Sequence, residues 1–135
     1  MANAERMPMS DAEQAVLKVL WDHGAMGVKD VLEKVTEAGQ EWSRSTVITL
    51  LQRLEKKGYV VCDRSQFAFV FQAAVSREDE MRARMNQLAG ELCDGETLPL
   101  VLAFAQQHRF SPDEIERFRE MIDQIKPKNK KRGGS

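Results

Sequence analysis

The sequence holds little of the chemistry on which enzymes and metal sites depend. Its 135 residues include two histidines, His23 and His108, and two cysteines, Cys62 and Cys93. The cysteines lack CxxC spacing and clustered histidines, so neither a disulfide framework nor a zinc site is indicated, and we expect ordinary core or half-buried thiols. Catalysis needs a nucleophile, a base and an orienting group that converge, or a metal. Neither histidine has a partner motif of that kind, so we expect no enzyme, no metal and no cofactor.

Long apolar runs are also missing. No stretch approaches the roughly 18 residues that a membrane span needs, and residues 1–6 lack the basic-then-apolar order of a signal peptide. We therefore expect a cytoplasmic protein with no membrane insertion. With 42% apolar and 30% charged residues, the composition fits one compact domain, or a small domain with an appendage.

The net charge of −1 conceals an uneven distribution. Residues 43–64 carry five cations against two acids, a net charge of +3, whereas residues 76–125 carry six arginines against eleven acids, a net charge of −5. The second segment should avoid phosphates. The last ten residues, 126–135, add five positive charges beside proline and glycine, which predicts a disordered basic tail. Such a tail can add nonspecific affinity for nucleic acid or serve as a solubilising end.

Two helices are predicted near the start of the chain. Ser10-Asp11-Ala12-Glu13 fits a capping box, and the apolar stripe that follows ends at Gly24, where we expect a left-handed residue. The second helix is predicted over residues 28–38, with Gly39 closing it. Both helices are expected to be structural.

The third predicted helix is the most informative segment. It starts at Ser43 or Ser45 and runs to Lys57, where Gly58 ends it. At about 100° per residue, one arc is apolar and can pack, whereas the opposite side is polar and can read bases in a DNA groove. The packing arc carries Val47, Leu50, Leu51 and Leu54, and the opposite side carries Ser45, Thr49, Gln52 and Lys56.

After this helix the apolar pattern changes from period 3.6 to period 2. Short β-branched and aromatic runs over residues 59–63 and 67–72 flank the polar link 64–66, which predicts a hairpin. Three helices and a two-stranded ribbon make a winged helix-turn-helix. Ribbon tips in this architecture lie close to the duplex, so Arg64 is a candidate for a phosphate or minor-groove contact. The alternative is a solvated turn arginine.

Three further helices with narrow apolar stripes are predicted over residues 76–125. Ser76 caps the first, the second covers about residues 98–107, and Ser111-Pro112 begins the last. About 50 residues with such stripes are a poor basis for an independent core, so we expect a second copy to cover them. A cofactor box lined by methionine is the alternative. The expected dimerisation residues are Met81, Met85, Leu88, Leu92, Leu98, Val101, Phe104, Ile115, Phe118 and Ile122.

The predicted fold class is therefore mainly α with a small β-hairpin. A winged helix-turn-helix DNA-binding domain is expected over residues 1–75, a helical dimerisation region over 76–125 and a basic tail over 126–135. A protein-interaction winged helix without sequence-specific DNA binding is the rival interpretation. Such a module would usually lack the basic, hydroxyl-rich face of the third helix.

Several segments together carry a family resemblance through their order and spacing. They are Ser10 to Glu13 with the apolar positions that follow, Trp42 to Gly58, Val75 to Glu78, Leu98 to Phe104 and Ser111 to Glu116. In this the chain resembles the penicillinase (β-lactamase) repressor family, also called BlaI/MecI/CopY, over about residues 8–125. The resemblance implies a homodimeric transcriptional repressor that occupies inverted-repeat operators in double-stranded DNA until an inducing signal removes it.

The resemblance also implies where DNA is contacted. In the family the start and outer face of the third helix contact DNA, and these positions correspond here to Ser43, Arg44, Ser45, Thr46, Thr49 and Arg53. Hydroxyls and free amides at a helix start bind phosphate oxygens, and arginine adds charge-assisted contacts to phosphate or a forked contact to guanine. Relatives usually carry a basic residue where this chain has Ile48. That side chain could touch a thymine methyl, or fold back onto the edge of the core.

Induction is the second point of departure from the family. Some members are inactivated by proteolysis at an Asn-Phe bond, triggered by a membrane receptor that senses a β-lactam. The corresponding pair here is Ala103-Phe104, so the asparagine is absent. The copper-responsive branch carries a cysteine-rich C-terminal motif that residues 126–135 lack, which disfavours copper sensing.

Overall fold

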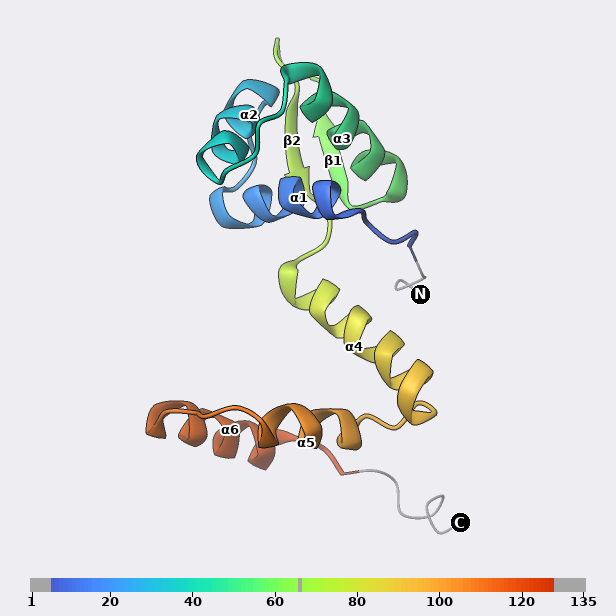
Figure 1. Ribbon diagram of the computed structural model, residues 1–135, viewed down its shortest axis with the longest axis vertical. Coiled ribbons are helices and arrows are strands. Elements are labelled where there is room, and N and C mark those ends of the chain that lie inside the picture. Colours follow the sequence, from blue (N-terminus) through green and yellow to red (C-terminus); the bar gives the residue numbers. More distant parts are fainter. Residues whose placement is uncertain (1–5, 66, 128–135) are drawn as a thin grey trace. The chain divides into compact units, whose positions relative to one another are not determined.

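The computed structural model describes residues 6–65 and 67–127, which form six helices and a two-stranded sheet (Figure 1). The order of the first five elements, three helices and then a hairpin, is that of a winged helix-turn-helix, as predicted. Two compact units, residues 1–87 and 88–135, divide the chain. The elements are α1 (Asp11–His23), α2 (Val28–Glu37), α3 (Arg44–Lys57), β1 (Val60–Asp63), β2 (Val70–Ala73), α4 (Arg77–Cys93), α5 (Leu98–Gln106) and α6 (Pro112–Gln124).

The start of α1 is the predicted capping box. The Glu13 amide donates to Ser10 Oγ at 3.1 Å, and the Ser10 amide donates to Glu13 Oε1 at 2.9 Å. At the other end, Gly24 has the expected positive φ of 91°, but its ψ of −173° is extended rather than left-handed helical. The extended ψ carries the chain into a bridge with β2, where Met26 and Phe71 exchange backbone hydrogen bonds of 3.0 and 2.9 Å.

The third helix begins and ends as its sequence predicts. Ser43 caps α3 through a hydrogen bond from the Thr46 amide, and Gly58 follows it in the left-handed conformation at φ 91°, ψ 10°. Glycine enters this region without the clash that a β-carbon brings. The Tyr59 amide then donates to the Leu54 carbonyl at 2.9 Å, which closes the helix and turns the chain into β1.

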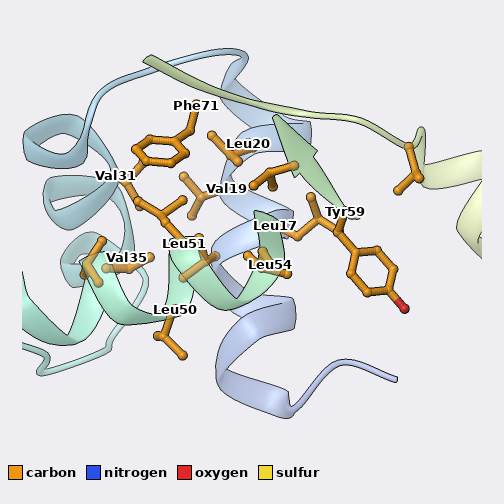
Figure 2. Packing of buried hydrophobic residues seen from close by; sticks show 14 residues of the cluster. Leu17, Val19, Leu20, Val31, Val35, Leu50, Leu51, Leu54, Tyr59 and Phe71 are labelled. Atoms are coloured by element: carbon orange, nitrogen blue, oxygen red, sulfur yellow. The ribbon is translucent and has the colours of Figure 1, made fainter. Parts of the chain in front are cut away.

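A single apolar core joins α1, α2, α3 and the hairpin. Leu17 of α1 packs with Leu51 and Leu54 of α3, and all three are fully buried (Figure 2). Val31 and Val35 bring in α2. Complete burial of such a side chain stabilises the fold by about 1.5–3 kcal/mol. The core therefore fixes the apolar arc of α3 inward and leaves its opposite side to solvent.

The hairpin differs from the prediction at the start of its second strand. The strands are antiparallel with Val60 opposite Ala73 and Asp63 opposite Val70, so β2 begins at Val70 and not at residue 67. Since β1 ends at Asp63, opposite Val70, Phe67 lies before β2 and has no residue of β1 to pair with. Phe67 is consequently fully exposed, although the alternation of aromatic residues resembled a strand.

The C-terminal elements follow the predicted order. Ser76 caps α4 through a hydrogen bond of 2.9 Å from the Asp79 amide, and α6 begins at a capping box formed by Ser111 and Glu114. The second of these helices, α5, ends at Gln106, one residue before the predicted end. Among the described residues of the second unit, 88–127, Ala89 alone is buried. This unit therefore has almost no core of its own within one chain.

Several remaining expectations concern single features. Cys62 and Cys93 are free thiols, and both are half-buried, as expected. Within residues 6–65 and 67–127, no helix combines the length and apolar character needed to cross a membrane. The basic tail expected over 126–135 lies outside the described residues apart from Lys126 and Pro127.

Candidate nucleic-acid interface

The outer face of α3 is exposed along its length, and the core explains why. The four apolar residues of the packing arc are buried, so the opposite side must face solvent. Of the predicted DNA-binding residues on this helix and at its cap, Thr46 and Ile48 are half-buried and the others are exposed. Part of the face forms an open hollow lined by Ser45, Thr46, Thr49, Leu50 and Arg53. The exposed residues are Ser43, Arg44, Ser45, Thr49, Gln52, Arg53 and Lys56.

Three hydroxyls gather at the start of α3. Ser43 Oγ accepts a hydrogen bond of 3.2 Å from the Thr46 amide and lies 3.1 Å from both Ser45 Oγ and Thr46 Oγ1. Other amides of a first helical turn have no partner inside the helix, and the helix dipole makes this end positive. Hydroxyls and amides placed together at such an end can hold an oxyanion such as a phosphate.

The charge of the 43–64 segment is distributed unequally between free and paired cations. Arg44, Arg53 and Lys56 are exposed and form no ion pair within the described part of the chain. Lys57 and Arg64 are each paired with a glutamate. The positive charge of this segment that is available to an anionic partner therefore lies at the start of α3 and on its outer face.

Lys57 is directed away from that face into a buried ion pair. Its Nζ donates to Glu13 Oε1 at 2.7 Å and to the Pro8 carbonyl at 2.9 Å. Burial raises the pKa of Glu13, but the hydrogen bonds from Lys57 and the Ser10 amide and the charges of Lys57 and Arg53 outweigh it, so the pKa lies below its ordinary value. The pair fastens the end of α3 to the start of α1.

The segment before α1 adds to the same junction. Arg6 Nε donates to the Gly58 carbonyl at 3.2 Å, and the Tyr59 hydroxyl donates to the Met7 carbonyl at 2.7 Å. The Arg6 guanidinium also lies 5.6 Å from the centre of the Tyr59 ring. Sequence reasoning found the capping role of Glu13 but missed this junction, because no local pattern marks contacts between residues about fifty positions apart.

Arg64 lies just after β1 and is held by α3. Its Nη1 and Nη2 donate to Glu55 Oε2 and Oε1, both at 2.9 Å, and its guanidinium lies 5.3 Å from the centre of the Phe69 ring. The hydrogen bonds from Arg64 lower the pKa of Glu55, so the glutamate is charged at neutral pH. Both sequence interpretations of Arg64, a DNA contact and a solvated arginine, left out this partner.

Ile48 lies at the margin of the outer face. It is half-buried, and its position on the helix falls between the buried arc that ends at Leu51 and the exposed Gln52. A side chain at this margin can contact the core edge and still present a methyl group to a partner.

The residues expected to mediate dimerisation form an exposed apolar set on α4, α5 and α6. Each is between 36% and 71% exposed in the single chain. A single copy therefore leaves more than a third of each of these side chains open to solvent. The set consists of Met81, Met85, Leu88, Leu92, Leu98, Val101, Phe104, Ile115, Phe118 and Ile122.

Aromatic contacts link part of this set in a way that the sequence did not suggest. The rings of Phe104 and His108 stack with their centres 4.2 Å apart, and those of Phe110 and Phe118 meet edge to face at 5.4 Å. The His108 ring nitrogen Nδ1 also lies 2.7 Å from the Phe104 carbonyl oxygen. His108 therefore packs among aromatic residues of the second unit. No group of three or more potential metal ligands occurs in residues 6–65 and 67–127.

Comparisons with known proteins support the resemblance. The family model described as "Penicillinase repressor" matches residues 9–124. The chain is 26% identical to the penicillinase repressor of Bacillus licheniformis over 122 residues, which cover 90% of this chain and 94% of that protein. It is also 26% identical over 115 residues to the methicillin resistance regulatory protein MecI of Staphylococcus aureus, covering 85% and 93% of the two chains.

Among solved structures, a similar chain is that of Bacillus licheniformis BlaI, in the solution structure of its monomeric form in complex with the blaP half-operator. It has 31% identity and a TM-score of 0.48, and the alignment covers 56% of this chain and 90% of that one. The family assignment rests on the match over residues 9–124, which spans both compact units. The chain belongs to the penicillinase repressor family.

Proposed function

We propose that this protein is a homodimeric transcriptional repressor that binds inverted-repeat operators in double-stranded DNA through α3 and the wing, which is the hairpin of β1 and β2. The exposed face of α3, with hydroxyls at its start and unpaired cations along it, is the observation that carries the proposal. The names of the relatives, a penicillinase repressor and a methicillin resistance regulatory protein, support a regulatory role.

The face has the size and chemistry of a major-groove reader. A major groove about 12 Å wide admits one α-helix. The hydroxyls and amides at the start of α3 would hold a phosphate, while Thr49, Gln52 and Arg53 would reach base edges. Lys56 lies near the other end of the helix and would contact the sugar-phosphate backbone of the DNA. In this arrangement phosphate contacts set the register and base contacts set the sequence preference.

Dimerisation is proposed for the region 76–125. One copy buries little of its own apolar surface there, and a second copy with the same exposed side chains could cover both sets. Two winged helices joined in this way would engage half-sites about one helical turn, roughly 34–36 Å, or a multiple of it apart. Dimer symmetry would then account for an inverted-repeat operator.

Induction is proposed to act on the same region, by a membrane receptor or a linked protease. The pair Ala103-Phe104 lies within α5, and Phe104 is exposed. Proteases cut extended, accessible chain more readily than intact helix, so cleavage here would first require α5 to unwind. Limited proteolysis with and without operator DNA would locate the first cut.

Fluorescence anisotropy with duplexes selected from the source genome tests the DNA-binding proposal. The affinity should fall steeply with salt, because lysine and arginine side chains displace counterions from DNA. Arg53→Ala should weaken operator binding by about 1–3 kcal/mol if the guanidinium makes a forked base contact, and by less if it touches only phosphate. The control Lys18→Ala removes the same charge from α1 and should change affinity little. Failure to bind any duplex above nonspecific strength would favour the protein-interaction module.

A further inference from the structure

The ion pair between the wing and α3 uses guanidinium N–H donors with which Arg64 could otherwise bind DNA. Two parallel N–H donors of the guanidinium meet the two carboxylate oxygens of Glu55, both at 2.9 Å. Arginine binds a phosphate through the same two-donor fork. That edge cannot serve both partners at once, and a phosphate that approaches the remaining N–H donors meets the negative charge of Glu55, so Glu55 and a DNA phosphate compete for the guanidinium.

The surroundings of the pair strengthen this competition. Phe69 lies against the guanidinium, with 5.3 Å between the ring centre and Arg64 Cζ, so the aromatic ring helps to hold the arginine in place. The Glu55 side chain is 29% exposed and the Arg64 side chain 50% exposed, so water and salt screen the pair only in part. An incoming phosphate must therefore displace an intramolecular partner that is already in position.

Glu55 also lies on the helix proposed to read DNA. It follows Gln52 by three residues, and positions three apart are neighbours on a helix surface. The pair as a whole carries no net charge. While Glu55 holds Arg64, this arginine therefore adds nothing to the attraction of the 43–64 segment for phosphate.

We propose that Glu55 withholds Arg64 from DNA phosphates, and thereby sets how much of the protein's DNA affinity is independent of base sequence. The inference rests on the proposed function, because it assigns a role to the wing of the same DNA-binding surface. Phosphate contacts supply essentially all nonspecific binding. A residue that removes one such contact lowers binding to unrelated DNA, while base contacts made by α3 are left in place.

The substitution Glu55→Gln separates this role from a merely structural one. It removes the competing charge and frees Arg64 for one phosphate contact, so the slope of log affinity against log salt should steepen by about 0.9 per protomer. Over a tenfold fall in salt, from 1 M to 0.1 M, this extra slope raises the affinity of Glu55→Gln relative to wild type by roughly 8-fold per protomer. If the pair only braces the wing, Glu55→Gln should weaken binding instead.

The experiment measures the affinity of the full-length chain for a duplex of arbitrary sequence at several salt concentrations. Wild type, Glu55→Gln, Arg64→Ala and the double variant form a double-mutant cycle. Glu116→Gln is the charge-matched control, because Glu116 pairs with Arg119 on α6, outside the winged helix. Melting temperatures of all variants report whether the fold is intact.

The proposal expects tighter, more salt-sensitive binding for Glu55→Gln alone. The double variant carries neither charge and should match the wild type in slope, whereas Arg64→Ala leaves Glu55 without its counter-charge and should weaken binding. An unchanged slope in Glu55→Gln, or a gain that persists in the double variant without Arg64, would overturn the proposal. If wild type and Glu55→Gln both bind DNA without salt dependence, the proposed function itself fails, which is a different result from a salt-dependent wild type with an unresponsive variant.

Discussion

Replacing Lys57 by methionine should destabilise the winged helix far more than the same replacement at its neighbour Lys56. The ammonium of Lys57 is the counter-charge of Glu13, whose side chain is only 2% exposed. Methionine keeps the length and apolar stem of lysine but removes that charge. The variant would leave a buried carboxylate with one remaining hydrogen bond, from the Ser10 amide.

The magnitude follows from the geometry of the pair. With 2.7 Å between Nζ and Oε1, the attraction at an effective dielectric constant of 20 is about 6 kcal/mol. Desolvation of the two charges offsets much of this attraction, and removal of one partner from a buried pair costs about 3–5 kcal/mol. The Lys57 side chain is 18% exposed, so water reaches it and the lower end of that range applies, about 3 kcal/mol. For a domain of this size, the melting temperature should fall by about 12–24 °C.

Chemical denaturation at several pH values measures the effect and tests its origin. The pKa of Glu13 in the folded wild type lies below its ordinary 4.5, so the pair's contribution is complete above about pH 4.5 and is lost as the pH falls through the folded pKa. Without Lys57, burial dominates and the folded pKa of Glu13 rises. Acidification then lowers the unfolding free energy of Lys57→Met less than that of the wild type. The difference in unfolding free energy between the two proteins should therefore narrow below about pH 4.5.

Comparing the stabilities of Lys56→Met and Lys57→Met can refute this reasoning. Lys56 is exposed, so Lys56→Met should change the unfolding free energy by less than about 0.5 kcal/mol while weakening DNA binding. Equal stability of the two variants at neutral pH would show that the Glu13 pair contributes nothing. Recovery of stability in Glu13→Gln combined with Lys57→Met would support the electrostatic origin, because no charge is then left buried.

Two further predictions concern the backbone and the assembly. Gly58→Ala should destabilise the fold by about 1–2 kcal/mol in thermal unfolding, because φ is +91° and the new Cβ would meet Arg6 Nε at 3.3 Å. Gly90→Ala, in helical backbone with open space around the new Cβ, should instead leave stability unchanged or raise it by up to about 1 kcal/mol, and a loss in both variants would contradict the conformational argument. Phe118→Asp or Leu88→Asp should yield monomers with weak operator affinity, and an unchanged mass by light scattering in both variants would rule out the proposed interface.

Much of the fold was predictable because local patterns specify it. The boundaries of α3 follow from a serine cap at one end and Gly58 at the other, and the apolar period fixes which side is buried. The hairpin was predictable as an element but not in its register. Strand pairing depends on where β1 stops, and the exposed Phe67 repeats the aromatic alternation without a partner strand.

The outer face of α3 was predictable for the same reason, since burial of one arc exposes the other. The charge on that face was not. Counting cations along the sequence treats Lys57 and Arg64 like the exposed Arg53, whereas their glutamate partners lie 44 and 9 residues away. Such pairings depend on how α1 and the wing pack against α3, which no local pattern encodes.

Enrichment of genomic fragments by the purified protein, followed by footprinting of the bound ones, tests the central claim most directly. We expect the enriched fragments to share an inverted repeat, with two protected half-sites about one helical turn or a multiple of it apart. Thr49→Ala or Arg53→Ala should alter the preferred bases, since those residues are proposed to face them. Fragments without a common sequence, bound no more tightly than unrelated DNA, would contradict the account.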